Sequence, residues 1–327
     1  MKAPNRGAAL LAAMLTVALV ATFAAAALWQ QWRSIEVETA ERARAQSAWV
    51  LTGALDWARL VLREDARAGG ADHLGEPWAV PLQEARLSSF LAADRNATAD
   101  VGPEVLEAFL SGQIIDLQSL LNVNNLVQDG KLSAPDFRGF GRLFDLLGLP
   151  PAELDRMAEN LRLASDTSGG NRPNPTAPLL PQRTEQLVWL GIPAETVEVL
   201  RPYVTVLPAR TQVNLNTAAA EVIYAAVDGL SMADAQRLVA ERARSYFRGV
   251  ADAKRAIGAG ETLFAEGQAG VGVASRYFEV RSRLRLDQLV VEERSLVQRD
   301  GFEVRALQRQ RRAPETAAPA QPQAPKR

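Results

Sequence analysis

The sequence predicts an α+β fold in which a long N-terminal helix packs on a small antiparallel sheet, with a large all-α domain between the two in the chain. Three observations support this fold class. An uncharged apolar run continues into a helical pattern that meets no breaker before Gly69. Helical periodicity, interrupted by loops, then fills residues 137–257, and polar and apolar residues alternate within residues 276–308. Helical and strand-forming stretches that are separated in the chain are typical of the α+β class.

The N-terminal apolar run is long enough to cross a membrane. Residues Ala8 to Trp29 include no charged residue. As a helix this run spans about 33 Å, against about 30 Å for a hydrocarbon core. Trp29 and Trp32 mark one membrane interface, and Lys2 and Arg6 mark the other. Because positive charges stay in the cytoplasm, we expect the rest of the chain on the opposite side of a single-pass anchor.

The small residue Gly7 stands before the apolar run. A secretory signal peptide, in contrast, has a shorter apolar run and carries its small-residue cleavage site after that run. A cut between Gly7 and Ala8 removes the basic leader, residues 1–7, and keeps the membrane helix. This arrangement resembles the type IV pilin and type II secretion pseudopilin class. In that class a prepilin peptidase cuts after such a glycine and methylates the new N-terminus. The alternative is a plain uncleaved anchor.

The fifth position of the expected mature chain departs from the usual pattern of that class. Most members carry Glu there, and this chain has Ala12. One minor pseudopilin family, general secretion pathway protein K, lacks the Glu as a rule. The resemblance therefore implies that Ala12 matters for pseudopilus assembly, because a helix with Ala there buries no carboxylate in the membrane.

The helical pattern continues past the membrane segment. Apolar and small residues recur at helical spacing along one face, namely Ser47, Val50, Leu51, Ala54, Leu55, Ala58, Val61 and Leu62. We therefore expect one helix of about 90 Å from Ala8 to about Ala68, ended by Gly69-Gly70. Residues 8–29 would cross the membrane and residues 30–68 would pack on a soluble body. The alternative is a break near Arg33 that leaves two helices.

Composition excludes several kinds of site. The formal net charge is −1, so there is no overall electrostatic case for nucleic acid. The chain has no cysteine and one histidine, His73, which rules out Cys/His zinc sites, disulfides and most catalytic triads. No catalytic constellation supports an enzyme.

Two helices are predicted around Gly229. Asn216 or Thr217 can cap the first, which would run to about Val227, and residues 232–243 form the second. The pair resembles a helix-hairpin-helix, which often holds a nucleic-acid backbone, so a membrane-tethered DNA receptor of an uptake system is the alternative function. Acidic residues interrupt its arginines, which favours simple packing and no nucleic-acid partner.

The C-terminal strands are predicted to form a three-stranded antiparallel sheet with one apolar face. Alternation is clear in residues 277–286, and residues 290–298 and 302–307 follow. Asp300-Gly301 is a typical hairpin turn. Residues 308–327 are rich in Pro, Ala, Gln and Arg and are expected to form a disordered tail.

Four further segments resemble the protein K family and occur in the family's order: Leu74–Ala79, Gly112–Leu126, Glu185–Gly191 and Arg201–Thr205. The resemblance implies a pilin-like α/β body from residues 69–126 and 271–307, with an inserted helical domain at 127–270. It also implies a bacterial inner-membrane anchor, a periplasmic C-terminal domain, and partnership with minor pseudopilins I and J. The complex would sit at the tip of the pseudopilus and initiate or cap its assembly for protein export across the outer membrane. The resemblance further implies contact with exported proteins. The alternative without a secretion role is a plain structural scaffold in the cell envelope.

The resemblance also raises the question of a calcium-binding site. Family members can bind it through an acidic loop of the inserted domain. Of the expected carboxylates only Asp166 remains here, with Asn171 and Glu185 as helpers. Calcium needs six to eight oxygen ligands, several of them charged. We therefore expect weak or no binding at Asp166, and no other cofactor.

Overall fold

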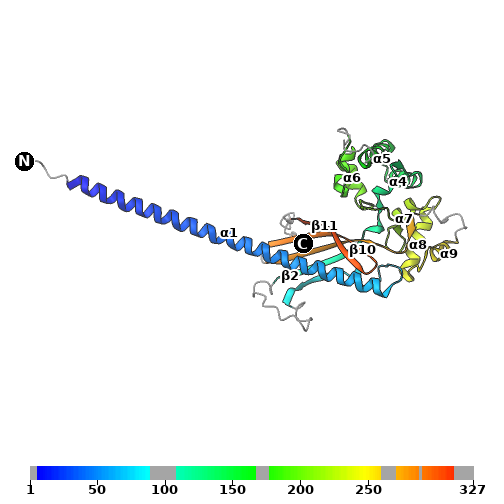
Figure 1. Cartoon of the computed structure of the whole chain (residues 1–327), viewed down its shortest axis with the longest axis horizontal. Helices are drawn as coiled ribbons and strands as arrows, with labels where there is room; N and C mark the ends of the chain where they lie inside the picture. The colour runs from blue at the N-terminus through cyan, green and yellow to red at the C-terminus, as the bar shows by residue number, and fades with distance from the viewer. Residues whose placement is uncertain (1–5, 89–107, 167–176, 259–269, 287–288, 313–327) are drawn as a thin grey trace, which may run out of the picture.

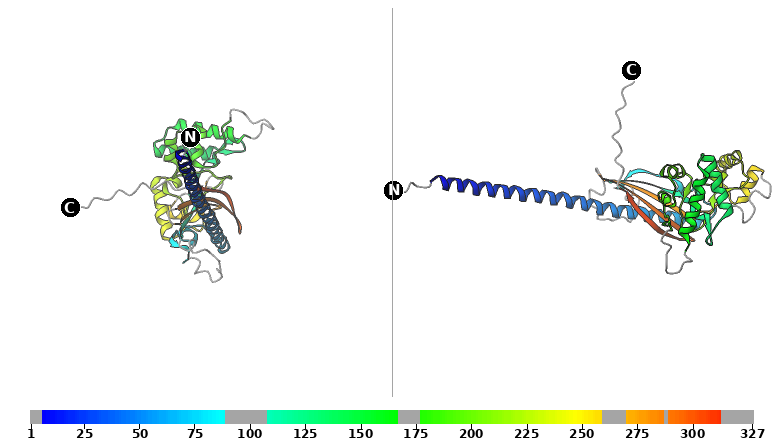
Figure 2. Two further views of the ribbon diagram at one scale, coloured as in Figure 1. Left: turned by 90° about the vertical axis from the view of Figure 1, so that its left-hand side faces the viewer. Right: turned by 90° about the horizontal axis from the view of Figure 1, so that it is seen from above.

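The long helix organises the molecule. In the computed structural model, which describes residues 6–88, 108–166, 177–258, 270–286 and 289–312, helix α1 runs without interruption from Arg6 to Ala68. Its 63 residues make it about 95 Å long. Every side chain from Ala9 to Arg42 is exposed, and this half projects alone from the body (Figures 1 and 2). The expected single helix is confirmed, and the alternative of a break near Arg33 is wrong.

The end of α1 is set by two glycines. Gly69 and Gly70 have φ of 67° and 117°, a region in which a Cβ is strained, so the chain can turn away from the helix there. The amide of Gly69 still bonds to the carbonyl of Asp65 at 3.1 Å. The short 3-10 helix η1 (Pro77–Ala79) follows and packs on α1.

The sheet is antiparallel throughout, and its strands lie in the order β1-β2-β9-β10-β11. The three expected C-terminal strands are confirmed as β9 (Tyr277–Leu286), β10 (Leu289–Asp300) and β11 (Glu303–Arg312). Two strands from before the helical part, β1 (Leu82–Arg86) and β2 (Phe109–Asp116), complete the sheet. Since β2 pairs with β9, the sheet joins chain segments on both sides of the helical part.

One glycine permits this long-range pairing. A Cβ on Gly112 of β2 would lie 2.9 Å from the carbonyl oxygen of Arg281 on β9, closer than side chains tolerate. A residue with a side chain at position 112 would therefore push the two strands apart at this point.

The face of α1 that was predicted to be apolar packs on the inner face of the sheet. Leu55 and Leu62 pack with Phe278 and Val297, while Leu51 lies in a second cluster beside Leu284 and Leu110; all are buried. Trp78 of η1 meets the ring of Phe278 edge-on, with 5.2 Å between centroids. The predicted fold class, a long helix on an antiparallel sheet with a helical insertion, is thereby confirmed.

The helical domain lies at the end of the body away from the N-terminus (Figures 1 and 2). Its elements are α4 (Ala134–Leu147), α5 (Pro151–Ser165), η4 (Thr184–Leu190), α6 (Ala194–Leu200), α7 (Ala220–Ala226), α8 (Met232–Arg244) and α9 (Val250–Ile257). Short strand pairs connect them: β3 (Leu121–Asn122) with β6 (Val204–Thr205), β4 (Val127–Gln128) with β5 (Lys131–Leu132), and β7 (Val213–Asn214) with β8 (Val271–Gly272). The 3-10 helices η2 (Leu117–Ser119) and η3 (Val123–Leu126) lead into the domain.

The core of this domain extends beyond the expected limits of residues 127 and 270. Leu121, Val123 and Leu126 are buried in it on one side, and Val271 is buried in it on the other. These residues therefore pack with the helices and not with the core between α1 and the sheet.

Buried asparagines hold the loops of this domain. The amide of Asn125 donates to the carbonyl of Thr211 at 2.7 Å, and its oxygen accepts from the amide of that residue at 3.1 Å. Asn216 bonds in the same two-way manner to the backbone of Phe247. A side-chain amide offers both a donor and an acceptor, so it can pair with a peptide group where no neighbouring strand exists.

Two sequence expectations need correction. Helix α7 begins at Ala220 after Ala219, so neither Asn216 nor Thr217 caps it. Both residues serve tertiary bonds instead, since Asn216 binds Phe247 and Thr217 binds Asp116. Strand β11 continues to Arg312, so a tail that starts at residue 308 is also wrong. Residues 313–327 lie outside the described part of the chain.

Candidate functional site

The expected processing and assembly residues lie in the first turns of α1. The helix begins at Arg6 and passes through Gly7 and Ala8, and Ala12 is exposed one turn later. Within the described residues one helix is long and apolar enough to cross a membrane, and it is α1. The exposed apolar side chains of this half have no packing partner within the described body, so the helix presents them to lipid or to other helices.

The expected metal ligand Asp166 lies at the C-terminal cap of α5 and is exposed. The following residues, including Asn171, fall outside the described part of the chain. Among the described residues, the group of carboxylates close enough to share an ion is a different one, Asp65, Asp72 and Glu76.

The hairpin between α7 and α8 uses its charged residues internally. Asp228 in the turn accepts from Arg142 at 2.8 Å and from Arg138 at 3.2 Å. The hydroxyl of Ser231 accepts from the amide of Asp234 at 3.1 Å and so caps α8. Carboxylates thus stand where a nucleic-acid phosphate would approach, which favours the packing interpretation over the DNA receptor.

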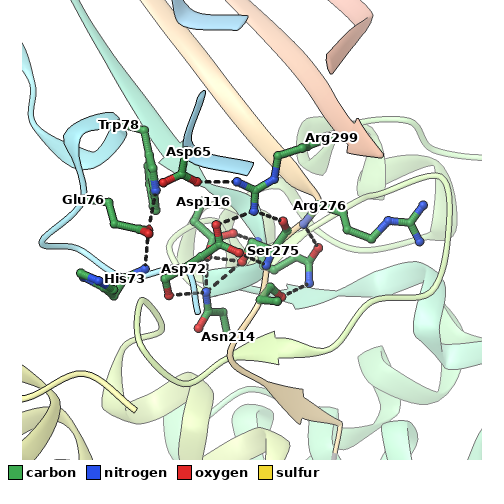
Figure 3. A network of polar contacts seen from close by, with 12 residues as sticks. Asp65, Asp72, His73, Glu76, Trp78, Asp116, Asn214, Ser275, Arg276 and Arg299 are labelled. Atoms are coloured by element: carbon green, nitrogen blue, oxygen red, sulfur yellow. Dashed lines mark hydrogen bonds and ion pairs between the residues drawn. The ribbon is translucent and has the colours of Figure 1, made fainter. Parts of the chain in front are cut away.

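A network of buried polar groups joins the helical domain to the sheet and to α1 (Figure 3). Asp116, the last residue of β2, is its hub. One carboxylate oxygen of Asp116 accepts from the hydroxyls of Thr217 and Ser275, each at 2.6 Å, and from the amide of Asn214 at 3.1 Å. The other oxygen accepts from the backbone amide of Gln118 at 2.8 Å. We call this network the polar junction.

A second carboxylate continues the polar junction to α1. Asp72, in the turn after α1, accepts from the amide of Ser275 at 2.6 Å and from the guanidinium of Arg299. Arg299 also donates to Asp65 of α1 at 2.5 Å and to the carbonyl of Ser275 at 2.8 Å. Its guanidinium lies over the ring of Phe278, 5.0 Å from the centroid. One arginine therefore ties α1, β10 and the chain before β9 together.

The three clustered carboxylates receive one positive charge and one neutral hydrogen-bond donor from within the protein. The ligand atoms of Asp65, Asp72 and Glu76 lie within 4.8 Å of one another. Glu76 accepts from the indole of Trp78 at 2.7 Å, and Arg299 bonds to the other two. The arginine supplies the positive charge at a position where a cation could otherwise bind, so the cluster works as a structural joint.

Burial shifts the pKa values of the aspartates in the polar junction. Loss of water raises the pKa of Asp116 from 3.8 to about 6, although hydrogen bonds from Ser275 and Thr217 act in the opposite direction. Burial also raises the pKa of Asp72 and of Asp65, against the lowering effect of Arg299. Carboxyl groups that bind protons more tightly in the folded state stabilise it more in mild acid than at neutral pH.

The sequence did not reveal the polar junction, because its members stand far apart in the chain. The available signal was local. Asp116 follows Ile114-Ile115, and Asn214 stands between Val213 and Leu215, so each is a polar residue inside an apolar segment. Such residues are buried with their neighbours and must find partners.

Comparison with known proteins agrees with this architecture. Two models described as "Type II secretion system (T2SS), protein K" match residues 119–209 and 213–273. The chain is 28% identical over 309 residues to the type II secretion system protein K of Pseudomonas aeruginosa strain PAO1, covering 88% of this chain and 86% of that protein. A chain in the crystal structure of the GspK-GspI-GspJ complex from the enterotoxigenic Escherichia coli type 2 secretion system has the same fold. The two structures superpose with a TM-score of 0.64 and are 19% identical in sequence. The alignment covers 83% of this chain and 98% of the Escherichia coli chain.

The matched regions lie in the helical domain, and the wider similarity takes in the long helix and the sheet. The resemblance inferred from the sequence is therefore confirmed. The chain is similar to the type II secretion system protein K family over most of its length, and this similarity is to structural pseudopilins.

Proposed function

We propose that this minor pseudopilin is anchored in the bacterial inner membrane by α1, holds its body in the periplasm, and stands at the tip of the type II secretion pseudopilus. There it initiates or caps assembly for protein export across the outer membrane. The observation that carries the proposal is the form of α1. One unbroken helix has an apolar half that contacts nothing in the described body and a second half that forms the core of that body.

The position at the tip is supported by two features. Ala12 brings no carboxylate into the apolar segment, so this subunit needs no neighbour ahead of it to neutralise one. The helical domain projects at the end of the body away from α1's apolar half (Figure 2), where it would obstruct another subunit stacked above. Both features favour a single copy at the end of the fibre.

The partners we propose are the pseudopilins I and J of the same system, together with the prepilin peptidase. The similar Escherichia coli chain was crystallised in a complex with GspI and GspJ. Small residues at Ala8, Ala9, Ala12, Ala13 and Ala18 allow close approach of neighbouring helices within the membrane. We also include exported proteins among the contacts of the helical domain in this proposal.

The division of the chain that we propose follows the contacts. Residues 1–7 form the leader, 8–29 the membrane segment and 30–68 the periplasmic part of α1. The helical domain is inserted between β2 and β9, and it includes β3, η3 and β8 because their residues bury with its core or join its strands.

Processing gives the first test. We expect mass spectrometry of the protein purified from membranes to find a chain that lacks residues 1–7 and begins with N-methyl-Ala8. Replacing Gly7 with Val should block the cut and leave the chain at its full length. An intact Met1 in the unaltered protein, or a cut after Ala25 or Ala27, would leave only a simple anchor or a secreted protein.

The tip position gives the second test. Gold labelling of an epitope in the helical domain should mark one end of each pseudopilus. Ala12→Glu should leave folding and processing intact, since Ala12 is exposed and distant from the body, while it reduces the number of fibres that begin correctly. Ala13→Glu serves as the matched control for a carboxylate placed one position away. Label along the whole fibre would refute the tip position, even though the similarity to the family would stand.

A further inference from the structure

A groove lies between the helical domain and the face of the sheet that points away from α1. Its volume is about 150 Å³. The sheet side is formed by Glu279 and Arg281 of β9, Arg294 and Leu296 of β10, and Gln308 and Gln310 of β11. The opposite side is formed by residues 182–185, Arg201 and residues 204–206 of the helical domain, and Leu117 and Leu120 of the chain leading into that domain also line the groove.

Positive charge predominates in this groove and is only partly compensated. Four arginines and two glutamates line it. Arg281 is paired with Glu279, and Arg201 is paired with Glu198 outside the groove. The guanidinium groups of Arg183 and Arg294 have no hydrogen bond or ion pair to any other residue in the described part of the chain. For Arg183 the Nε atom is also shut off from solvent.

The register of the sheet makes Arg294 more unusual. Arg294 lies directly opposite Arg281 on β9 and opposite Gln310 on β11. Like charges on directly opposed strands are destabilising. Arg281 has Glu279 to offset this, whereas Arg294 has no carboxylate partner among the described residues, and it is only half exposed. A half-buried, unpaired guanidinium beside another cation costs stability unless something else supplies a negative charge.

We propose that this groove binds an extended acidic segment of a partner protein, with carboxylates bonded to Arg294 and Arg183. Guanidinium groups accept carboxylates in charge-assisted, two-point hydrogen bonds. Leu296 and Val206 line the same groove and suit the apolar side chains that alternate with acidic ones along a strand. Gln308 and Gln310 offer donors and acceptors to a backbone.

The lining disfavours other anions. Nucleic acid that binds in such grooves stacks its bases on aromatic side chains, and among the described residues no aromatic side chain lines this groove. The carboxylates of Glu185 and Glu279 would also repel a continuous phosphate backbone. A small anion gains little from an open groove that is partly apolar, whereas a peptide can use both the charges and the leucines. Binding in this groove would not depend on the position of the subunit in the fibre.

Fluorescence anisotropy with the full chain in detergent tests the proposal. The probe is a labelled ten-residue peptide that alternates Glu and Val. We expect saturable binding that weakens about tenfold or more in Arg183→Gln/Arg294→Gln and falls with added salt. Arg244→Gln, the same change at an exposed arginine of α8 outside the groove, should bind as the unaltered protein does.

The following outcomes of the binding experiment would contradict the proposal. Equal binding of a Gln/Val peptide would mean that the carboxylates are not recognised. Equal or tighter binding of a ten-nucleotide single strand of DNA would mean a general polyanion surface. No binding of the Glu/Val peptide, or no loss in the double variant, would mean that the groove is not the site. The double variant Arg183→Glu/Arg294→Glu provides a second check. Because its groove charges are reversed, it should bind a Lys/Val peptide and no longer bind the Glu/Val peptide.

Discussion

Replacing Arg299 with Met is expected to lower the free energy of unfolding by about 3–5 kcal/mol at pH 7. The side chain of Arg299 is 10% exposed and bonds to Asp65 and Asp72, whose side chains are 9% and 4% exposed. Methionine keeps much of the packing over Phe278 but leaves two buried carboxylates without their cation. Removing one partner of a buried charge network has a cost of this order. Urea unfolding in detergent, followed by tryptophan fluorescence, measures it, and the bond from Trp78 to Glu76 makes that indole a local reporter.

The matched control is Arg305→Met on the same hairpin. Arg305 pairs with Glu303 at 2.6 Å, but both side chains are more than half exposed, so no measurable change in the free energy of unfolding is expected. The loss in Arg299→Met should shrink in mild acid, because Asp65 and Asp72 can then take up protons. A loss of the same size at pH 4 and pH 7 would show that packing on Phe278, and not charge, is what the arginine contributes.

The stability of the protein is expected to depend on the protonation of Asp116. Its pKa is about 6 in the folded protein and 3.8 as its ordinary value, so the folded state binds the proton more tightly. The stability from this group is fully present below about pH 3.8 and is lost as the pH rises through 6. Two pKa units correspond to about 3 kcal/mol, of which about 2 kcal/mol should fall between pH 4 and pH 7.

Asp116→Asn isolates that contribution. The variant cannot ionise at this position, whereas Asp65 and Asp72 titrate in both proteins and largely cancel. The difference in unfolding free energy between the variant and the unaltered protein should therefore move by about 2 kcal/mol in favour of the variant from pH 4 to pH 7. A difference that stays constant with pH would mean that folding does not raise the pKa of Asp116 above its ordinary value.

Both predictions concern the polar junction, which fixes the orientation of the helical domain relative to the body formed by α1 and the sheet. The polar junction links β2, the turn after α1, the chain before β9, and β7, all through side chains that accept or donate several bonds each. An apolar contact of the same size would tolerate sliding, whereas these hydrogen bonds specify one orientation. For a subunit proposed to stand at the tip, a fixed orientation of the helical domain presents one surface to partners.

Local sequence determined the elements whose pattern is repeated many times. The apolar face of α1, from Leu51 to Leu62, recurs over several turns, so one helix was predictable and its end at Gly69 followed from backbone freedom. Strands β9, β10 and β11 were predictable from alternation and from the turn at Gly301. The membrane segment and the family were recognisable for the same reason, since both reside in contiguous residues.

Tertiary structure alone decided the rest. Whether β2 pairs with β9, whether Asp116 meets Ser275, and whether Arg299 finds Asp65 depend on where the chain returns after the helical domain, and no short window of sequence contains that information. Asn216 and Thr217 do not cap α7 for this reason: each can cap a helix locally, but each bonds instead to a partner that is distant in the chain. Likewise the sequence shows Arg294 as one more polar residue of an alternating strand, and only the register reveals that it faces Arg281 with no carboxylate among the described residues to offset it.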